Sequence, residues 1–403
     1  MSALRIAPAE LLRGDDAVEA LAGRLRHTVP SPAGGTPLVL LVHGEHGYPV
    51  VRGRLDAALG AARVEVVRHP HQGPCRLSAI EAIATEASRA GADWVLGVGG
   101  GRVVDVGKGA ALAAGVPYAA LPTSPATCAA TAPTVVLYDD AGRHLEVRED
   151  GASAAVAALD ASLLASAPDR LLAAGIADAW AKVHEVRLTN ARCGPGTESA
   201  AGARPGAVTV GAATSRAALA LLDDLAVLLA EHARPALAAG PSGELDGSLL
   251  PQRRLVAEAV VAYPGLIGGL AGADVKLALA HPLHDALTAI AGSHAALHGE
   301  KVAFGTLVQI LVAGRNGLER SDAERGQAMH AEAAAYAELG LVCHLEALGC
   351  GAARTPAVEE ATVRWALADP YVRQALPELT FAQLVAAMRQ VDAWLRARAG
   401  LDG

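Results

Sequence analysis

Residues 92–111 read ADWVLGVGGGRVVDVGKGAA: a short apolar run meets three consecutive glycines and continues as a helix-forming segment. The apolar run is typical of a buried parallel strand, and the glycines let the backbone approach a phosphate closely. The first N–H groups of the following helix supply a partial positive charge at that point. Taken alone, the pattern fits either a phosphate-binding turn or a turn that is merely tight.

Strand and helix signals alternate on both sides of this segment. Short apolar runs at 37–42, 62–68 and 116–124 predict further strands, and 78–90 has helical spacing. Such alternation predicts a parallel, doubly wound α/β sheet of the Rossmann-like type. From about residue 165 the pattern becomes helical and rich in Ala and Leu. The expected helices lie at 168–188, 213–234, 252–270, 274–291, 300–315, 325–349 and 380–399. We therefore predict an α/β domain over residues 1–164 and an all-α domain over residues 165–403.

The composition excludes several classes of protein. Of 403 residues, 52% are apolar and 19% charged, which suits a large core and excludes a disordered chain. The net charge of −8 argues against general binding to nucleic acid or anionic membranes. Five cysteines without a CxxC pair argue against a disulfide scaffold and fit a reducing compartment. The N-terminus lacks the apolar run of a signal peptide, so we expect a cytoplasmic enzyme with a small-molecule substrate.

The segment LPTSPATCAATAPTVVLYDDAGRH (121–144) follows one of the predicted strands. Its hydroxyls and backbone amides could wrap a dinucleotide, although a plain polar connection into a hairpin is the simpler interpretation. The hairpin is predicted over 135–147, with its turn at Asp-Ala-Gly. Asp105 and Lys108, three residues apart on the helix after the glycines, are expected to form a surface ion pair unless they serve a cofactor.

Histidines are concentrated in HPLHDALTAIAGSHAALHGEKVAFGTLVQ (281–309). His281 and His284 share one helix face, and His298 begins the next predicted helix. Asp178 lies in another helix, within GIADAWAK (175–182). A set of imidazoles and a carboxylate from different helices suits a divalent zinc or iron site with open positions. Any single histidine here could equally be structural.

Four segments in order resemble the iron-containing alcohol dehydrogenase superfamily, most closely its glycerol dehydrogenase branch. They are GGGRVVDVGK (99–108), LPTSPATCAATAPT (121–134), APDRLLAAGIADAWAK (167–182) and HGEKVAFGTLVQ (298–309). The resemblance runs from about residue 36 to 315. It implies an NAD(P)-dependent, metal-containing oxidoreductase whose active site lies between a nucleotide-binding domain and a helical domain. It also implies self-association, as a dimer or an octamer.

The resemblance assigns roles to particular residues. The cofactor pyrophosphate would lie on Gly99, Gly100 and Gly101, with Asp105 nearby. Thr123, Ser124 and Thr127 would line the nicotinamide and phosphate channel. Asp178, His281 and His298 match the three metal ligands, and His284 would relay a proton, orient the substrate or support the ligands from outside. The iron enzymes carry a fourth ligand, a histidine, where this chain has Lys182, whose ammonium has no lone pair. The resemblance with this departure implies one divalent metal, zinc rather than iron.

Three further departures concern the substrate and the cofactor. Cys128 stands where glycerol dehydrogenases carry an aspartate that contacts the polyol, so glycerol itself is doubtful. The Cys128 thiol would form an apolar wall or lie near the metal. Lys276 would be either a solvated lysine or a cation that binds a substrate phosphate or carboxylate. The acid that often follows the first strand in NAD-selective relatives is displaced to Glu45, so we expect NAD with NADP also accepted.

These features favour oxidation of a secondary alcohol, of polyol or cyclitol-like type, to its ketone. The alternative is a non-redox, NAD-using cyclase or lyase of the 3-dehydroquinate synthase type that acts on a phosphorylated sugar, with which Lys276 is compatible. A third interpretation is a binding protein that has lost catalysis. The retention of Asp178, His281 and His298 together argues against it.

Overall fold

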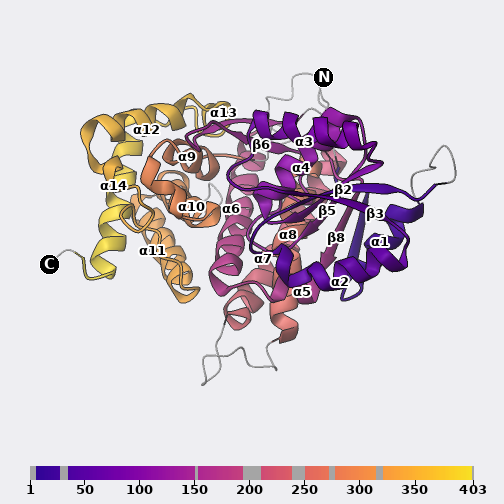
Figure 1. Ribbon diagram of the computed structural model, residues 1–403. Helices are drawn as coiled ribbons and strands as arrows, with labels where there is room; N and C mark the ends of the chain where they lie inside the picture. The colour runs from indigo at the N-terminus through magenta and orange to yellow at the C-terminus, as the bar shows by residue number, and fades with distance from the viewer. Residues whose placement is uncertain are drawn as a thin grey trace.

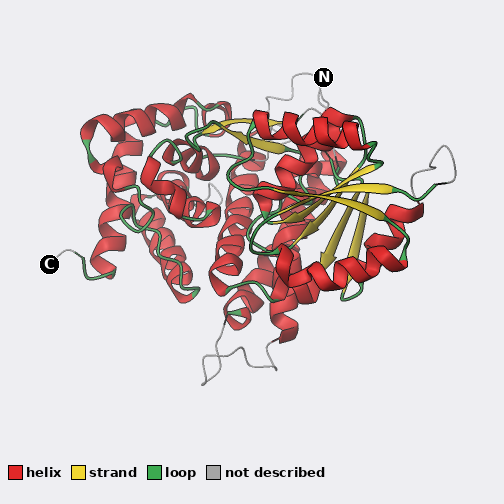
Figure 2. Ribbon diagram, in the orientation of Figure 1, coloured by secondary structure: helices red, strands yellow, loops and turns green. Residues whose placement is uncertain are grey.

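The computed structural model describes residues 6–27, 35–149, 153–193, 210–237, 250–271, 277–314 and 321–401. Two parts lie side by side in Figure 1, one built around a twisted sheet and the other, which holds the C-terminus, built from helices. Figure 2 shows the long strands gathered in the first part, with helices above and below them.

The main sheet has six strands, and every pairing in it is parallel. In spatial order the strands are β1 (Glu10–Gly14), β8 (Val156–Asp160), β5 (Tyr118–Pro122), β4 (Trp94–Gly99), β2 (Leu38–His43) and β3 (Glu65–Pro70). The predicted strands are confirmed. The sequence pattern does not predict β1 or β8. The residues of β1, ELLRG, contain charges and lie at the edge of the sheet, and those of β8, VAALD, form a short buried strand directly before a helix.

The two faces of the sheet bury alternate residues of each strand. Val39 and Leu41 pack with α1 (Ala17–His27) and α2 (Tyr48–Ala61). Leu40 and Val42 face the other way, toward α3 (Leu77–Ala90) and α4 (Gly101–Ala114). Helices therefore cover both faces, which confirms the doubly wound architecture.

The helical part begins immediately after β8. Its helices are α5 (Ala161–Ala165), α6 (Asp169–Cys193), α7 (Val210–Ala236), α8 (Leu250–Ala271), α9 (Ala280–Leu287), α10 (His298–Ala313), α11 (Asp322–Glu338), α12 (Pro356–Ala368), α13 (Pro370–Ala375) and α14 (Phe381–Arg398). The apolar cluster on one face of the sheet continues into α6, α7 and α8. Because this core crosses residues 164 and 165, the domain boundary there stays a prediction. The predicted hairpin is present as β6 (Val135–Tyr138) and β7 (His144–Arg148).

Two expected helices are shorter in the structure, and the sequence pattern does not predict α1, α2, α5, α12 and α13. Helix α11 ends at Glu338 rather than near 349, because Gly340 takes a left-handed backbone with φ of 75°. Helix α9 covers only Ala280–Leu287 of the expected 274–291. Pro282 has no N–H to donate to a preceding turn, so the helix starts just before it.

Helix α8 is the one helix in the described ranges that is long and apolar enough to cross a membrane by length and composition. Most of its apolar window is buried inside the protein, against α7 and the sheet-side core. It is therefore a core helix of this fold.

Glycines allow α6 to approach two neighbouring segments backbone to backbone. A Cβ on Gly299, in the first turn of α10, would lie 1.8 Å from the carbonyl oxygen of Ala174 in α6. A Cβ on Gly175 would lie 1.7 Å from the carbonyl oxygen of Pro125. Backbone cannot move aside as a flexible side chain can, so both positions require glycine. These contacts fix α6 against α10 and against the segment after β5.

The Gly299 contact predicts a matched pair of opposite stability effects. Gly299→Ala forces α6 and α10 apart and should destabilise the protein by about 1–3 kcal/mol. Gly53→Ala, in the exposed middle of α2 with open space around its Cβ, should stabilise it by about 0.5–1 kcal/mol. Urea unfolding of both variants measures the difference. Equal effects would contradict the close contact.

Candidate active site

Three side chains converge where α6, α9 and α10 meet. Asp178 Oδ1 lies 3.1 Å from His281 Nε2 and 3.2 Å from His298 Nε2. One potential ligand atom from each residue lies within 4.8 Å of the others. Within the described residues this is the group that could hold a metal ion, and it is the set predicted from the sequence. One carboxylate and two imidazoles on three helices suit a zinc or iron(II) ion with positions left for substrate.

Burial and mutual charge shape this group. Burial would raise the pKa of Asp178, but His298 and His281 hold it well below its usual range. Burial would lower the pKa of His281, yet the carboxylates of Glu185 and Asp178 outweigh it and raise the pKa to about 9. The protein thus surrounds a buried carboxylate with cationic groups, and a divalent cation could take over that role.

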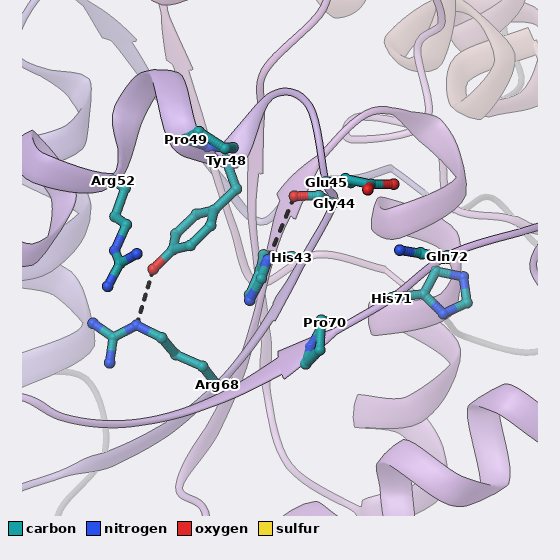
Figure 3. A pocket seen from close by; sticks show the side chains of 10 residues that line it. All are labelled: His43, Gly44, Glu45, Tyr48, Pro49, Arg52, Arg68, Pro70, His71 and Gln72. Carbon is teal, nitrogen blue, oxygen red and sulfur yellow. Dashed lines mark hydrogen bonds between the residues drawn. The ribbon is translucent and has the colours of Figure 1, made fainter.

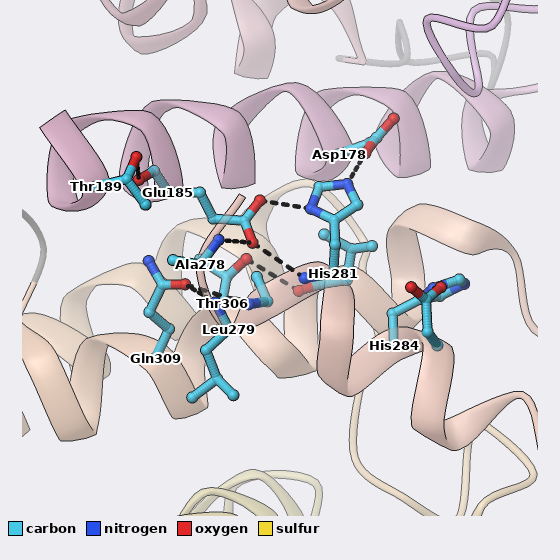
Figure 4. A network of polar contacts seen from close by, with 12 residues as sticks. Asp178, Glu185, Thr189, Ala278, Leu279, His281, His284, Thr306 and Gln309 are labelled. Carbon is cyan, nitrogen blue, oxygen red and sulfur yellow. Dashed lines mark hydrogen bonds and ion pairs between the residues drawn. The ribbon is translucent and has the colours of Figure 1, made fainter. Parts of the chain in front are cut away.

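Glu185 is a supporting residue that the sequence analysis missed. Its Oε2 lies 2.5 Å from His281 Nδ1, as Figure 4 shows. Its Oε1 accepts hydrogen bonds from the backbone N–H groups of Ala278 and His281. Because the Nδ1–H of His281 donates to Glu185, Nε2 is the ring nitrogen that faces Asp178. A metal ion that displaced the Nε2 proton would meet the lone pair of this nitrogen. The available signal was spacing, because Glu185 lies seven residues, or two helical turns, after Asp178.

Glu185 also caps α9. The N-cap position is occupied by Leu279, which has no side-chain acceptor for the free N–H groups of the first turn. Two residues of other helices replace it: Glu185 of α6 as described, and Gln309 of α10. The Gln309 side-chain oxygen accepts from the N–H groups of Leu279 and Ala280. The helix that carries His281 therefore begins on polar groups of the two helices that carry the other ligands.

His284 lies beside the ligand group rather than in it. Its Nε2 is 3.0 Å from His298 Nδ1, and its Nδ1 is 2.9 Å from Asp285 Oδ1. A His298 that offers Nε2 to a metal carries its proton on Nδ1 and donates it to His284. Burial and the nearby His298 lower the pKa of His284 to about 3, so the ring is neutral and can accept. His284 thus orients His298 as Glu185 orients His281.

The structure also shows the surroundings of three other residues near the candidate metal site. His184, two residues after Lys182 on α6, is directed toward Glu332, with its Nε2 3.6 Å from Glu332 Oε2. Lys182 lies buried on α6, and its charge acts on His281 and Glu185. Burial and the charge of Asp178 raise the pKa of the Cys128 thiol to about 12. The neutral thiol fits the apolar-wall interpretation.

The glycine turn lies beside the predicted hydroxyl-bearing segment. Gly99 ends β4, Gly100 is the N-cap of α4 and Gly101 is its first residue. A Cβ on Gly101 would lie 2.7 Å from Thr127 Oγ1, and one on Gly100 would lie 3.4 Å from Ser124 Oγ. Thr123 contacts the backbone at Gly47, where a Cβ would lie 2.0 Å from its Oγ1. The carboxyl ends of β2, β4 and β5 therefore meet at one edge of the sheet, where such folds bind dinucleotides.

The prediction that Asp105 and Lys108 form an ion pair at the surface is wrong, because both side chains are buried. Lys108 Nζ lies 3.5 Å from Asp105 Oδ1. The same ammonium donates to the carbonyl oxygens of Ala129, Ala132 and Thr134. Burial, opposed by Lys108, raises the pKa of Asp105 to about 6. The pair fastens the segment that follows Cys128 to the helix that follows the glycine turn.

Glu45 lies apart from these groups. Glu45 is exposed in the turn after β2, where it borders a pocket next to the glycine turn. Lys276 lies outside the described residues. Its predicted role in binding a substrate anion therefore stays a prediction.

Comparisons with known proteins match this geometry. The family model described as iron-containing alcohol dehydrogenase matches residues 21–168. Hydroxycarboxylate dehydrogenase A of Escherichia coli (strain K12) is 30% identical over 277 residues, which cover 68% of this chain and 70% of that protein. This chain belongs to the iron-containing alcohol dehydrogenase family. It is therefore an oxidoreductase of an NAD-dependent, metal-containing family of alcohol dehydrogenases.

Two further relatives place it near the glycerol dehydrogenase branch of that family. A glycerol dehydrogenase of Escherichia coli O6:H1 is 34% identical, over 60% of this chain and 61% of its own length. The solved structure of a probable glycerol dehydrogenase from Sinorhizobium meliloti 1021 superposes with a TM-score of 0.74 at 25% identity. That superposition covers 98% of this chain and 100% of the other. These relatives are dehydrogenases by name and lend no support to the non-redox cyclase alternative.

The Glu185 contact predicts a selective loss of metal affinity in this dehydrogenase. In Glu185→Gln, the amide oxygen can still accept from the α9 backbone, but its NH₂ group cannot accept from His281 Nδ1–H. The ring then loses the partner that keeps Nε2 free, and zinc affinity should fall about 10–100-fold. Titration of the metal-free protein with zinc measures this.

A matched control is available in the α/β part. His69 Nδ1 lies 2.6 Å from Glu86 Oε2, a similar histidine–carboxylate contact elsewhere in the chain. Glu86→Gln should leave zinc affinity unchanged. An unchanged affinity in Glu185→Gln would show that Glu185 does not orient His281.

Proposed function

We propose that this enzyme interconverts a secondary alcohol, of polyol or cyclitol-like type, and its ketone by hydride transfer to and from NAD(P). The observation that carries the proposal is the convergence of Asp178, His281 and His298 from three helices. The glycine turn and the Thr/Ser-bearing segment support the nucleotide part of the proposal, because backbone and hydroxyl groups of this kind suit a dinucleotide. Asp105 and Lys108 support that segment from behind.

We propose zinc as the metal. The donor set fits a divalent ion, because both imidazoles are held with Nε2 toward the Asp178 carboxylate. Three protein ligands that leave a position for substrate are characteristic of catalytic zinc, although iron(II) accepts the same donors. Lys182 occupies the position of the additional histidine in the iron enzymes and offers no lone pair. A metal bound here supplies Lewis-acid polarisation of the substrate oxygen.

The nucleotide supplies the hydride acceptor at C4 of its nicotinamide. In the proposal, the backbone of Gly99, Gly100 and Gly101 binds the pyrophosphate. Thr123, Ser124 and Thr127 line the channel that leads from there toward the ligand group. Glu185 and His284 hold the two rings, and the neutral His284 accepts a hydrogen bond from the Nδ1–H of His298. Buried surroundings around these groups limit the access of bulk water to the transferred hydride.

The substrate side of the proposal follows from Cys128. A protonated thiol is a poor acceptor for a polyol hydroxyl. We therefore expect a substrate with fewer hydroxyl groups near this wall than glycerol would place there. Lys276, close ahead of His281 in the chain, would suit a substrate with a carboxylate or phosphate. We further propose a cytoplasmic location, since the four cysteines whose side chains the structure describes are free thiols. We also propose a homo-oligomer, as the resemblance to the family implies.

The proposal predicts a measurable metal and cofactor stoichiometry. Purified protein should contain about one zinc per chain by elemental analysis. It should reduce NAD(P)⁺ with one or more members of a panel of polyols, cyclitols and hydroxy acids, and a chelator should abolish that reduction. Full activity after exhaustive chelation would contradict the proposal.

Removal of one ligand separates metal binding from nucleotide binding. His281→Ala should lose bound metal and turnover while keeping its affinity for 5′-AMP, because the glycine turn lies on other elements. His294→Ala is the matched control, because His294 lies on the short 3₁₀ helix between the ligands and is exposed. Normal metal content in His281→Ala would rule out the assigned ligand set.

A further inference from the structure

A cavity of about 330 Å³ opens at the carboxyl ends of β2 and β3. Figure 3 shows its walls, which come from the end of β2, the turn and start of α2, and the end of β3. The cavity adjoins the proposed cofactor cleft. A Cβ on Gly44, in its wall, would lie 3.2 Å from Val103 in the first turn of α4. Gly47, in the same turn, lies against Thr123.

Two arginines form one side of this cavity. Arg68 Nε donates to the hydroxyl of Tyr48 at 2.9 Å, and its Nη2 donates to Asp56 Oδ1 at 2.6 Å. These contacts hold the guanidinium from behind and leave Nη1 without a hydrogen bond to the described residues. Arg52 Nε lies 3.5 Å from Asp56 Oδ2, and its side chain is 61% exposed. Arg52 and Arg68 carry two positive charges, and the one carboxylate that they share, Asp56, carries a single negative charge. A net positive charge therefore remains to bind an anion between them.

The opposite side of the cavity lacks the acid that marks selectivity for NAD. Such sites place a carboxylate on the ribose 2′-hydroxyl, and that carboxylate repels a 2′-phosphate. Here β2 ends at His43 and is followed by Gly44, which has no side chain. In Figure 3, Glu45 lies across the cavity from Arg52 and Arg68 and points away from them. Among the described residues that line the cavity or contact these arginines, the carboxylate next to a phosphate bound there would be that of Asp56, which they already bind.

Two stacked rings lie between the two sides, the buried Tyr48 ring and the partly exposed His43 ring. The rings of His43 and Tyr48 stack with centroids 4.1 Å apart and planes 27° from parallel. Burial lowers the pKa of His43, so this ring is neutral and its face suits stacking. The cavity thus combines an aromatic ring for stacking, a glycine backbone that a ligand can approach closely, and two guanidinium groups.

We propose that this cavity binds the adenosine half of NADP(H), with the 2′-phosphate held by Arg52 and Arg68. Arginine suits this role because its planar fork can give two parallel hydrogen bonds to phosphate oxygens. Tyr48 and Asp56 pre-order Arg68, so less side-chain freedom is lost on binding. The inference rests on the proposed dinucleotide cleft and deepens it: this chain discriminates in favour of the 2′-phosphorylated cofactor.

The test measures binding of adenosine fragments, which requires neither metal nor alcohol. Isothermal titration calorimetry compares 5′-AMP, adenosine 2′,5′-bisphosphate and adenosine 3′,5′-bisphosphate with the full chain. The 2′,5′ compound should bind at least about tenfold more tightly than 5′-AMP, because its added phosphate gains charge-assisted hydrogen bonds. The 3′,5′ compound carries the phosphate of coenzyme A-type ligands and should bind more weakly than its 2′,5′ isomer.

Variants of the two arginines test whether they cause the tighter binding of adenosine 2′,5′-bisphosphate relative to 5′-AMP. Arg52→Ala should lower the preference for the 2′,5′ compound over 5′-AMP about tenfold, without changing the affinity for 5′-AMP. Because Arg52 is largely exposed, this variant should fold normally. Arg68→Gln tests the second arginine. Arg89→Ala, at the exposed end of α3, removes the same charge from the same part of the chain and should leave the preference intact.

The outcomes separate this inference from the proposed function. Binding of 5′-AMP with no gain from a 2′-phosphate would overturn the inference and leave an NAD-linked dehydrogenase standing. An equal gain from the 3′-phosphate would overturn the 2′ assignment. A preference that survives Arg52→Ala and Arg68→Gln would remove the arginines from the site. Binding of none of the three nucleotides would overturn both the inference and the proposed cleft.

Discussion

The contact between Glu185 and the start of α9 is the interaction on which the ligand group depends. One carboxylate accepts two backbone N–H groups of α9 and the Nδ1 proton of His281, so a single group sets where the helix begins and which ring nitrogen faces Asp178. Gln309 completes the cap from α10. Since α6 and α10 also meet backbone to backbone at Gly299, the three ligand-bearing helices form one rigid unit.

Buried charges are paired on both sides of the candidate site. On the metal side, Asp178 and Glu185 face His281 and His298, and burial makes these attractions stronger than they would be in water. On the nucleotide side, Asp105 faces Lys108. Between the two lies Cys128, whose neutral thiol adds no charge. The buried charges therefore form pairs with one another, and the position between them that Cys128 occupies is uncharged.

The sequence predicts four of the six strands from local apolar runs, and the family-like segments predict the candidate metal-binding triad. Apolar runs of β2 and β4 mark buried strands, and the family-like segments carry Asp178, His281 and His298 with them. The roles of Glu185 and Gln309 could not be predicted, because each acts on a helix that lies far away in the chain. The same limit applies to Lys108: spacing alone pairs it with Asp105, whereas burial and three distant carbonyls decide its role.

The Lys108 anchor has a consequence for how such an enzyme diversifies. The segment from Ser124 to Cys128 is held at one end by β5 and at the other by the ammonium that fixes residues 129–134. Between these two fixed ends, residue 128 can change without displacing the glycine turn. Under the proposed function, a related enzyme could therefore accept a different alcohol through a change at this position and keep its nucleotide site unaltered.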